Sequence, residues 1–129
     1  MKSFLQHLAI SAVAALAPIK PVIITVGVLV MADLISGIWA AVKRKEPITS
    51  AALGRTVTKM VVYQTAVVTG FLLQIHLLGN ALPVINIVGG LIGLVEFKSF
   101  LENANYIVGG DIMKEILRRL GSKNDDKLS

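Results

Sequence analysis

Long apolar runs, interrupted by turn residues, set the pattern of the chain. From Met60 to Val95 no Asp, Glu, Lys or Arg occurs, and a helix needs about 20 apolar residues to cross a bilayer. The run is therefore long enough for two spans. Gly79 and Asn80 can end one helix and Pro83 can begin the next. The pattern predicts a helical hairpin with spans at 60–79 and 82–100.

A further span is predicted at 21–42, which is apolar except for Asp33. At 1.5 Å per residue this segment is roughly 33 Å long, enough to cross the hydrocarbon with a slight tilt. Asp33 then lies near the midplane, where an ionised and unpaired carboxylate is costly. We expect no Lys or Arg of the other spans at this depth. Asp33 is therefore expected either to carry a proton and hydrogen-bond between helices, or to be ionised and face a watery lumen.

The N-terminal segment allows two interpretations. Residues 3–19 are apolar and end in Ala15-Leu16-Ala17, as signal peptides do, but Pro18 makes a poor cleavage junction, so we expect the segment to be retained. It forms either a short fourth span, paired with 21–42 through the turn from Pro18 to Pro21, or an interfacial helix.

The C-terminal segment has a different character. Asp111 can cap a helix over 111–120, with Gly121 as its stop, and residues 122–129 form a polar tail. The helix has an apolar stripe and a charged face, which is typical of a membrane-surface or partner-binding helix. The stripe consists of Ile112, Ile116, Leu117 and Leu120, and the charged face of Lys114, Glu115, Arg118 and Arg119.

Cations gather on two segments that flank the predicted spans. One is the loop from Lys43 to Lys59, and the other follows the last span. The positive-inside rule places both in the cytoplasm and the Asn80 turn on the opposite side. Aromatic side chains, which favour membrane interfaces, fall near the cytoplasmic level: Trp39, Tyr63, Phe97 and Phe100.

Composition agrees with lipid as the solvent. Hydrophobic residues make up 54% of the 129 positions and charged residues 16%, against about 25% charged in soluble domains. We predict an all-α integral membrane protein with one membrane-embedded domain over 1–121. Its net charge of +5 comes with no nucleic-acid motif, there is no cysteine, and His7 and His76 lie on different apolar segments. No catalytic, metal or cofactor site is therefore predicted, and no nucleic-acid partner.

Small residues spaced four apart predict close helix packing. Ala32, Ser36 and Ala40 form one row of the first span, and Asp33, Gly37 and Ala41 form the adjoining row. Gly89 and Gly93 form a similar face in the last span. Such faces let helix backbones approach closely in lipid. The contact can lie within one chain or between subunits, and the pattern leaves both open.

Charged residues at the base of the hairpin predict two ion pairs. Arg55 and Lys59 share one helix face, and Glu96, Ser99, Glu102 and Asn103 share another. Because the hairpin is antiparallel, the two faces meet at one level. We predict that Lys59 pairs with Glu96 and Arg55 with Glu102.

Three short motifs, in order, resemble those of a known family. They are Asp33-Leu-Ile-Ser-Gly-Ile-Trp-Ala-Ala41, Ser50-Ala-Ala-Leu-Gly-Arg-Thr-Val-Thr-Lys59 and Glu96-Phe-Lys-Ser-Phe-Leu-Glu-Asn103. On a three-span frame they look like the phage holins of the toxin-secretion/phage-lysis type, over about 28–110. The motif positions carried over are Asp33, Gly37, Ala41, Ser50, Gly54, Arg55, Lys59, Glu96, Ser99, Glu102 and Asn103.

The resemblance implies a multi-pass protein of the host inner (cytoplasmic) membrane. It implies a homo-oligomer that opens lesions and so releases an endolysin, without contacting it, or a secreted toxin; an antiholin can be a further partner. Our interpretation of the motif residues gives Asp33 and Ser36 the role of seam and switch, Gly37 and Ala41 close packing, and Ser50 a helix start. Two rivals remain: a non-lytic structural component of a virion or membrane, and a small channel or transporter subunit lined by Asp33, Gln74 and His76.

Overall fold

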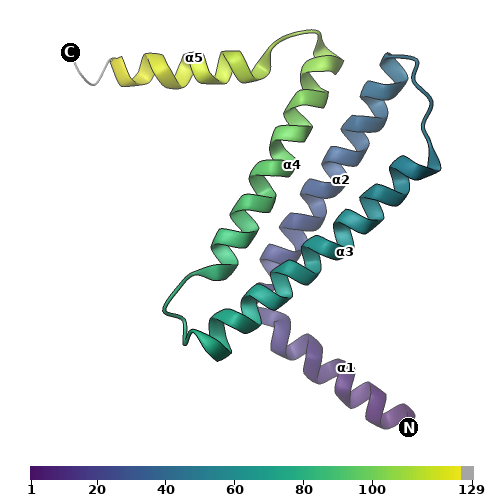
Figure 1. The fold of residues 1–129 in the computed structure, drawn as a ribbon, viewed down its shortest axis with the longest axis vertical. Coiled ribbons are helices and arrows are strands. Elements are labelled where there is room, and N and C mark those ends of the chain that lie inside the picture. The colour runs from purple at the N-terminus through teal and green to yellow at the C-terminus, as the bar shows by residue number, and fades with distance from the viewer. Residues whose placement is uncertain (126–129) are drawn as a thin grey trace.

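A computed structural model describes residues 1–125. Within these residues, all regular secondary structure is helical. Three long helices lie side by side and run alternately up and down: α2 (Lys20–Lys43), α3 (Ser50–Leu72) and α4 (Val84–Val108) (Figure 1). Two further helices, α1 (Lys2–Leu16) and α5 (Ile112–Asp125), project from this bundle. Helical stretches over 2–43, 50–77 and 84–108 are long and apolar enough to cross a bilayer. The all-α membrane architecture is thus confirmed.

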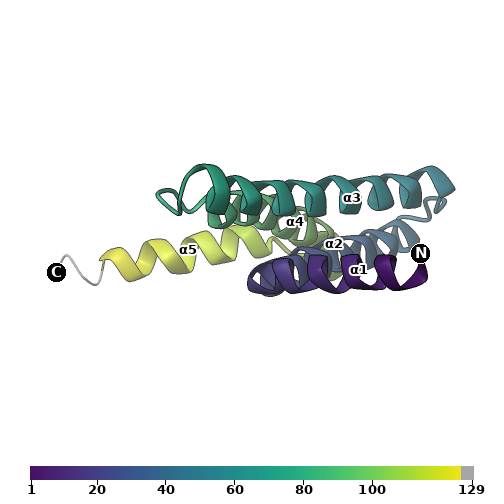
Figure 2. The ribbon, with the colours of Figure 1, turned by 90° about the horizontal axis from the view of Figure 1, so that it is seen from below.

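The bundle has two distinguishable ends and two layers. We call the end with residues 44–49, which join α2 to α3, the loop end, and the end with the α3–α4 connection the turn end. Seen from below, α3 lies over the pair formed by α2 and α4 (Figure 2). Helix α2 packs on α4 more extensively than α3 packs on either. The α2–α4 pair is therefore the most tightly packed part of the fold.

Helix α1 does not fold back on α2. The two helices are joined by a 3₁₀ turn, η1 (Ala17–Ile19), which contains Pro18, and α1 leaves the bundle across its axis (Figure 1). No residue of α1 is buried. Of the two interpretations of the N-terminal segment, the pairing of 3–19 with 21–42 is therefore wrong, because Pro18 tightens one turn without reversing the chain.

Helix α3 begins well before residue 60, where the apolar run starts. Ser50 is its first residue, and Thr49 is the cap, with its Oγ1 accepting a hydrogen bond of 3.2 Å from the Ala52 N–H. The helix start predicted at Ser50 is correct within one position. The predicted span begins at 60, where the charges end, whereas the capped helix itself extends back through the charged residues to Ser50.

The turn end confirms the predicted break between two helices. After a π-helical turn, η2 (Leu73–Leu77), Gly79 and Asn80 adopt positive φ angles of 52° and 62°. Gln74 fixes the connection: its Nε2 donates to Asn80 Oδ1 at 3.2 Å, and its Oε1 accepts from the Ile85 N–H at 3.0 Å. The Gln74 side chain thus supplies the first turn of α4 with an acceptor.

Small residues allow the close contact of α2 with α4 inside one chain. Ser36 and Ala40 are buried. A Cβ on Gly89 would lie 3.2 Å from Val22 Cγ1, and one on Gly93 would lie 3.6 Å from Leu29 Cδ1. Of the two interpretations left open by the small-residue faces, these contacts agree with packing within the chain.

The outer surface of the bundle is apolar. Along α2, an exposed stripe recurs every three or four residues: Ile24, Val28, Met31, Ile35 and Trp39. The apolar core is small and lies toward the turn end, where Ile19, Val26, Val67, Phe71, Ile85 and Ile92 form one buried cluster. An apolar exterior around a partly polar interior is the arrangement that lipid solvation favours.

Helix α5 is longer than the sequence predicts. Its N-terminus is capped as expected, because Asp111 Oδ1 accepts from the Lys114 N–H at 3.0 Å. The helix then continues through Gly121 to Asp125, so Gly121 is not its stop. Residues 122–125 of the predicted tail are helical, and 126–129 lie outside the described residues.

Candidate functional site

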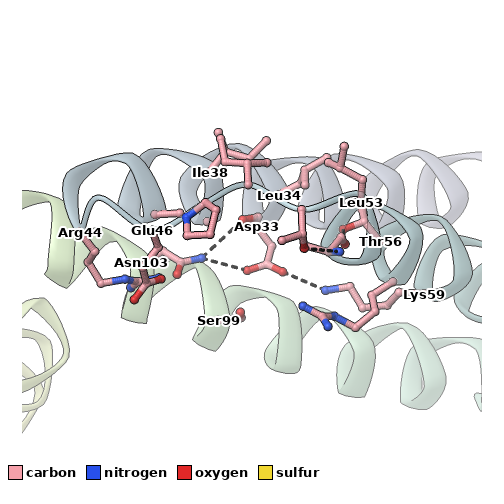
Figure 3. Close-up of a pocket in the computed structure, with 17 residues that line it drawn as sticks. Asp33, Leu34, Ile38, Arg44, Glu46, Leu53, Thr56, Lys59, Ser99 and Asn103 are labelled. Carbon is pink, nitrogen blue, oxygen red and sulfur yellow. Dashed lines mark hydrogen bonds and ion pairs between the residues drawn. The ribbon is translucent and has the colours of Figure 1, made fainter.

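A charged network joins the three bundle helices in the half of the bundle nearer the loop end. Lys59 Nζ, from α3, lies 2.8 Å from Asp33 Oδ2 of α2 and 2.8 Å from Glu96 Oε2 of α4. Figure 3 shows the Lys59 side chain reaching Asp33. One ammonium group therefore bridges carboxylates from two different helices, and we call Asp33, Lys59 and Glu96 the triad.

The early start of α3 explains why Lys59 reaches Asp33. Lys59 lies roughly 14 Å along α3 from its first residue, and Asp33 lies roughly 15 Å from the last residue of α2, at 1.5 Å per residue. Because both distances start at the loop end, the two side chains lie at one depth. The expectation that no cation lies at the depth of Asp33 is therefore wrong, because Lys59 pairs with it.

Glu96 is the most deeply buried charged group of the site. Its side chain is 1% exposed, and its Oε1 accepts a hydrogen bond of 2.9 Å from the Tyr63 hydroxyl. Oε2 faces the Lys59 ammonium group, which is its only polar partner among the described residues. Tyr63 and Lys59 are four residues apart on α3, so one face of this helix supplies both partners of Glu96.

Asn103 of α4 completes the site on the opposite side of Asp33. Its Nδ2 lies 3.2 Å from Asp33 Oδ1 and 3.1 Å from Ser36 Oγ. Gly37 lies against this amide, since a Cβ there would be in ordinary van der Waals contact, 3.5 Å from Asn103 Nδ2. Each carboxylate of the triad thus has one oxygen facing Lys59 and the other facing a neutral donor.

The triad carries more negative than positive charge. Two carboxylates share one ammonium group, and within residues 1–125 Arg55 joins neither of them. Inside a membrane, the stability of such an arrangement changes strongly when one charge is added or removed, because low polarity strengthens every electrostatic interaction.

A cavity at the loop end leads to one side of the triad. Its volume is about 510 Å³, and its lining includes Asp33, Lys59 and Arg55 together with residues of the 44–49 loop (Figure 3). The Asp33 side chain is 14% exposed, against 1% for Glu96. Of the two carboxylates, Asp33 is therefore the one that the cavity reaches.

The second ion pair predicted at the hairpin base is not formed. Glu102 Oε1 lies 3.1 Å from Lys98 Nζ, one turn away on α4, and within residues 1–125 no ion pair joins Glu102 to Arg55. Arg55 lines the cavity instead. The pair that is formed, Lys59 with Glu96, is the deeper of the two, and burial in lipid leaves such charges no alternative partner.

The remaining predicted residues are divided between the cavity and the surface. Ala41 and Ser99 line the cavity, and Gly54 has no described atom within 4 Å of where a Cβ would be. Sequence reasoning missed Tyr63 as a partner of Glu96, although its spacing from Lys59 indicated a shared face. It also missed Arg44, which pairs with Glu46 at 3.0 Å and lies over the Tyr106 ring.

Within residues 1–125, no three His, Asp or Glu side chains are grouped as metal ligands would be. What the site can do is electrostatic: it holds α3 against α2 and α4 through charges that lipid cannot solvate. Charged side chains at this depth in a membrane protein commonly have a functional role in addition to their role in helix packing.

Comparison with known proteins agrees with the motifs. No curated protein and no solved structure matches the chain. The Bacteriophage holin family, by contrast, matches residues 11–122, which include α2, α3 and α4 and most of α5. The chain therefore belongs to the bacteriophage holin family.

Proposed function

We propose that this protein permeabilises the host cytoplasmic membrane by oligomerising there, and so releases an endolysin to the cell wall. The observation that carries the proposal is the triad. A lesion in lipid needs a polar lining, and this chain keeps the three charged side chains of the triad between α2, α3 and α4, behind a largely apolar exterior.

The closed bundle then opens by release of α3. Helix α3 is the least packed of the three, and Lys59, Tyr63 and Gln64 tie it to its neighbours through polar contacts. Its departure separates Lys59 from Asp33 and Glu96 and turns all three toward water. The α2–α4 pair stays together because its small-residue contacts do not depend on α3.

In the proposed topology the loop end is cytoplasmic and the turn end faces outward. The cations at Lys43, Arg44 and Lys45 favour this orientation. A continuous stretch over 2–43 is about 63 Å long at 1.5 Å per residue, roughly twice the hydrocarbon thickness. Because α2 already crosses the membrane, α1 lies on the outer face as an interfacial helix.

The channel alternative draws less support from the contacts of its candidate residues. The Gln74 amide is used by Asn80 and Ile85 at the turn, and His76 is exposed on η2. No contact favours a fixed narrow pathway through Asp33, Gln74 and His76.

Inducible expression in a bacterium, with and without a cytoplasmic endolysin, tests the proposal. We expect respiration to stop suddenly at a reproducible time and lysis to follow only when the endolysin is present. Lysis by a folded endolysin excludes a small channel, and continued respiration at full expression overturns permeabilisation. The Lys98→Gln variant, which changes an exposed ion pair, serves as a control with unaltered timing.

A further inference from the structure

We propose that α5 lies on the cytoplasmic leaflet and binds the headgroups of anionic phospholipids through Lys114 and Arg119. The proposal needs α4 to cross the membrane with its C-terminus inside, and it holds whether or not the protein permeabilises the membrane.

A hydrogen-bonded corner fixes the direction of α5. Helix α4 ends where Gly109 adopts a positive φ of 68°, a conformation that favours glycine. The Ile112 N–H then donates to Asn105 Oδ1 at 2.6 Å, so a side chain of α4 holds the first residue of α5. Helix α5 consequently leaves α4 at a marked angle instead of continuing its axis (Figure 1).

The sides of α5 differ in the way that an interfacial helix requires. At 100° per residue, Ile112, Ile116, Leu117 and Leu120 fall within an arc of about 140°. Ile112 and Ile116 are half-buried, but Leu117 and Leu120 are 62% and 61% exposed, so the bundle leaves this half of the arc uncovered. Arg119 lies about 20° outside one edge of this arc and Lys114 about 60° outside the other, so their long side chains can extend to headgroups while their stems cover apolar surface.

Glu115 does not oppose binding of α5 to an anionic surface. Glu115 lies away from the centre of the apolar arc, and its carboxylate is held by two arginines. Arg118 donates to it at 3.0 and 2.8 Å, and Arg119 at 2.8 Å. One carboxylate shared by two guanidinium groups, with Lys114 beside them, leaves this stretch positive.

Lipid fits the exposed arc better than a protein partner does. The arc begins at the corner next to Val108, which is 64% exposed at the end of a membrane-spanning helix, so it continues a surface that already faces lipid. Cations on both sides of the arc complement the anionic headgroups of the cytoplasmic leaflet, where surface charge attracts basic segments.

Single cysteines provide the test, because the chain contains none. Full-length protein is reconstituted into vesicles of phosphatidylcholine alone or with a quarter phosphatidylglycerol, and an environment-sensitive fluorophore is attached at Leu117→Cys, Leu120→Cys or Ser122→Cys. Ser122 is the matched control, since it lies on α5 opposite the arc and is exposed. Acrylamide quenches fluorophores in water, and nitroxide lipids quench those in the membrane.

In the anionic vesicles we expect acrylamide to quench the fluorophores at 117 and 120 several-fold less than the one at 122, and nitroxide lipids to quench them several-fold more. High salt, or Lys114→Gln with Arg119→Gln, should reduce the difference toward that in phosphatidylcholine alone. Equal acrylamide quenching at the three positions overturns the proposal. So does protection at 117 and 120 from both quenchers, which indicates a protein partner.

Discussion

Lys59 Nζ lies 2.8 Å from a carboxylate oxygen of Asp33 and 2.8 Å from one of Glu96, so a single side chain of α3 holds both neighbouring helices. The three groups come from the three holin-like motifs of the sequence. Their meeting in one network gives these motifs a common physical role, which is to keep charges inside the closed bundle.

Replacing the cation of the triad should destabilise the protein strongly. Lys59→Met leaves Glu96 buried without its counter-charge, and breaking a buried pair from one side costs about 3–5 kcal/mol. Unfolding of the purified protein in detergent, followed by the fluorescence of Trp39, measures the loss. Lys98→Met removes an exposed ion pair and should cost about 1 kcal/mol or less. Equal losses in the two variants would contradict the central role of Lys59.

The charge balance of the triad predicts a non-additive effect on lysis timing. Asp33→Asn and Glu96→Gln each leave one carboxylate for Lys59, so each should stabilise the closed bundle and delay lysis. The double variant leaves Lys59 without a counter-charge and should lyse early or fail to accumulate. The time of lysis with a co-expressed endolysin, at matched protein levels, is measured for the two single variants and the double variant. Identical timing of Asp33→Asn and the unaltered protein would exclude Asp33 as a switch.

Variants of two adjacent glycines of α4 distinguish packing within the chain from packing between chains. Gly89→Val places methyl groups against Val22 Cγ1, 3.2 Å from the new Cβ, and should cost about 1–3 kcal/mol of unfolding free energy. Gly90→Val meets no described atom within 4 Å and should change monomer stability little. Detergent unfolding compares them, and cross-linking in membranes reports oligomers. A stable Gly89→Val monomer that fails to oligomerise would place this face between subunits.

The ion pairs of α5 predict a pH dependence with a definite sign. Hydrogen bonds from Arg118 and Arg119 hold the pKa of the Glu115 carboxyl below its ordinary value. Because the pKa of Glu115 is lower in the folded state than in the unfolded chain, its ion pairs stabilise the helix fully at any pH above the pKa of the unfolded chain. This stabilisation is lost as the pH falls through the lower pKa of the folded state.

Hydrogen exchange of the α5 amides, read by mass spectrometry, measures this dependence. Protection should stay constant at mildly acidic pH, once the intrinsic exchange rate is taken into account, and fall only below the ordinary range of glutamate. Glu115→Gln should remove this step and leave the protection of α4 unchanged. A loss of protection near neutral pH would refute the assignment to Glu115.

The sequence by itself determined the membrane architecture, because hydrophobic length and turn residues act locally. The uncharged run from Met60 to Val95 and the Gly79-Asn80 break predicted the hairpin, and both are present. Lys59 and Glu96 could also be paired from sequence, since a short antiparallel connection restricts which residues meet. Asp111 was recognised as a cap, since capping depends on neighbouring residues alone.

Only the tertiary structure decided what Asp33 contacts. Its partner depends on where α3 begins, on the depth that this gives Lys59, and on α3 lying over both α2 and α4. None of these is a property of the 21–42 segment. The same holds for the small-residue faces. Their sequence pattern is the same for contacts within a chain and between chains, and only the folded chain shows that Val22 lies against Gly89. Local pattern fixes which residues lie in the membrane, whereas the identity of their partners follows from how whole helices pack.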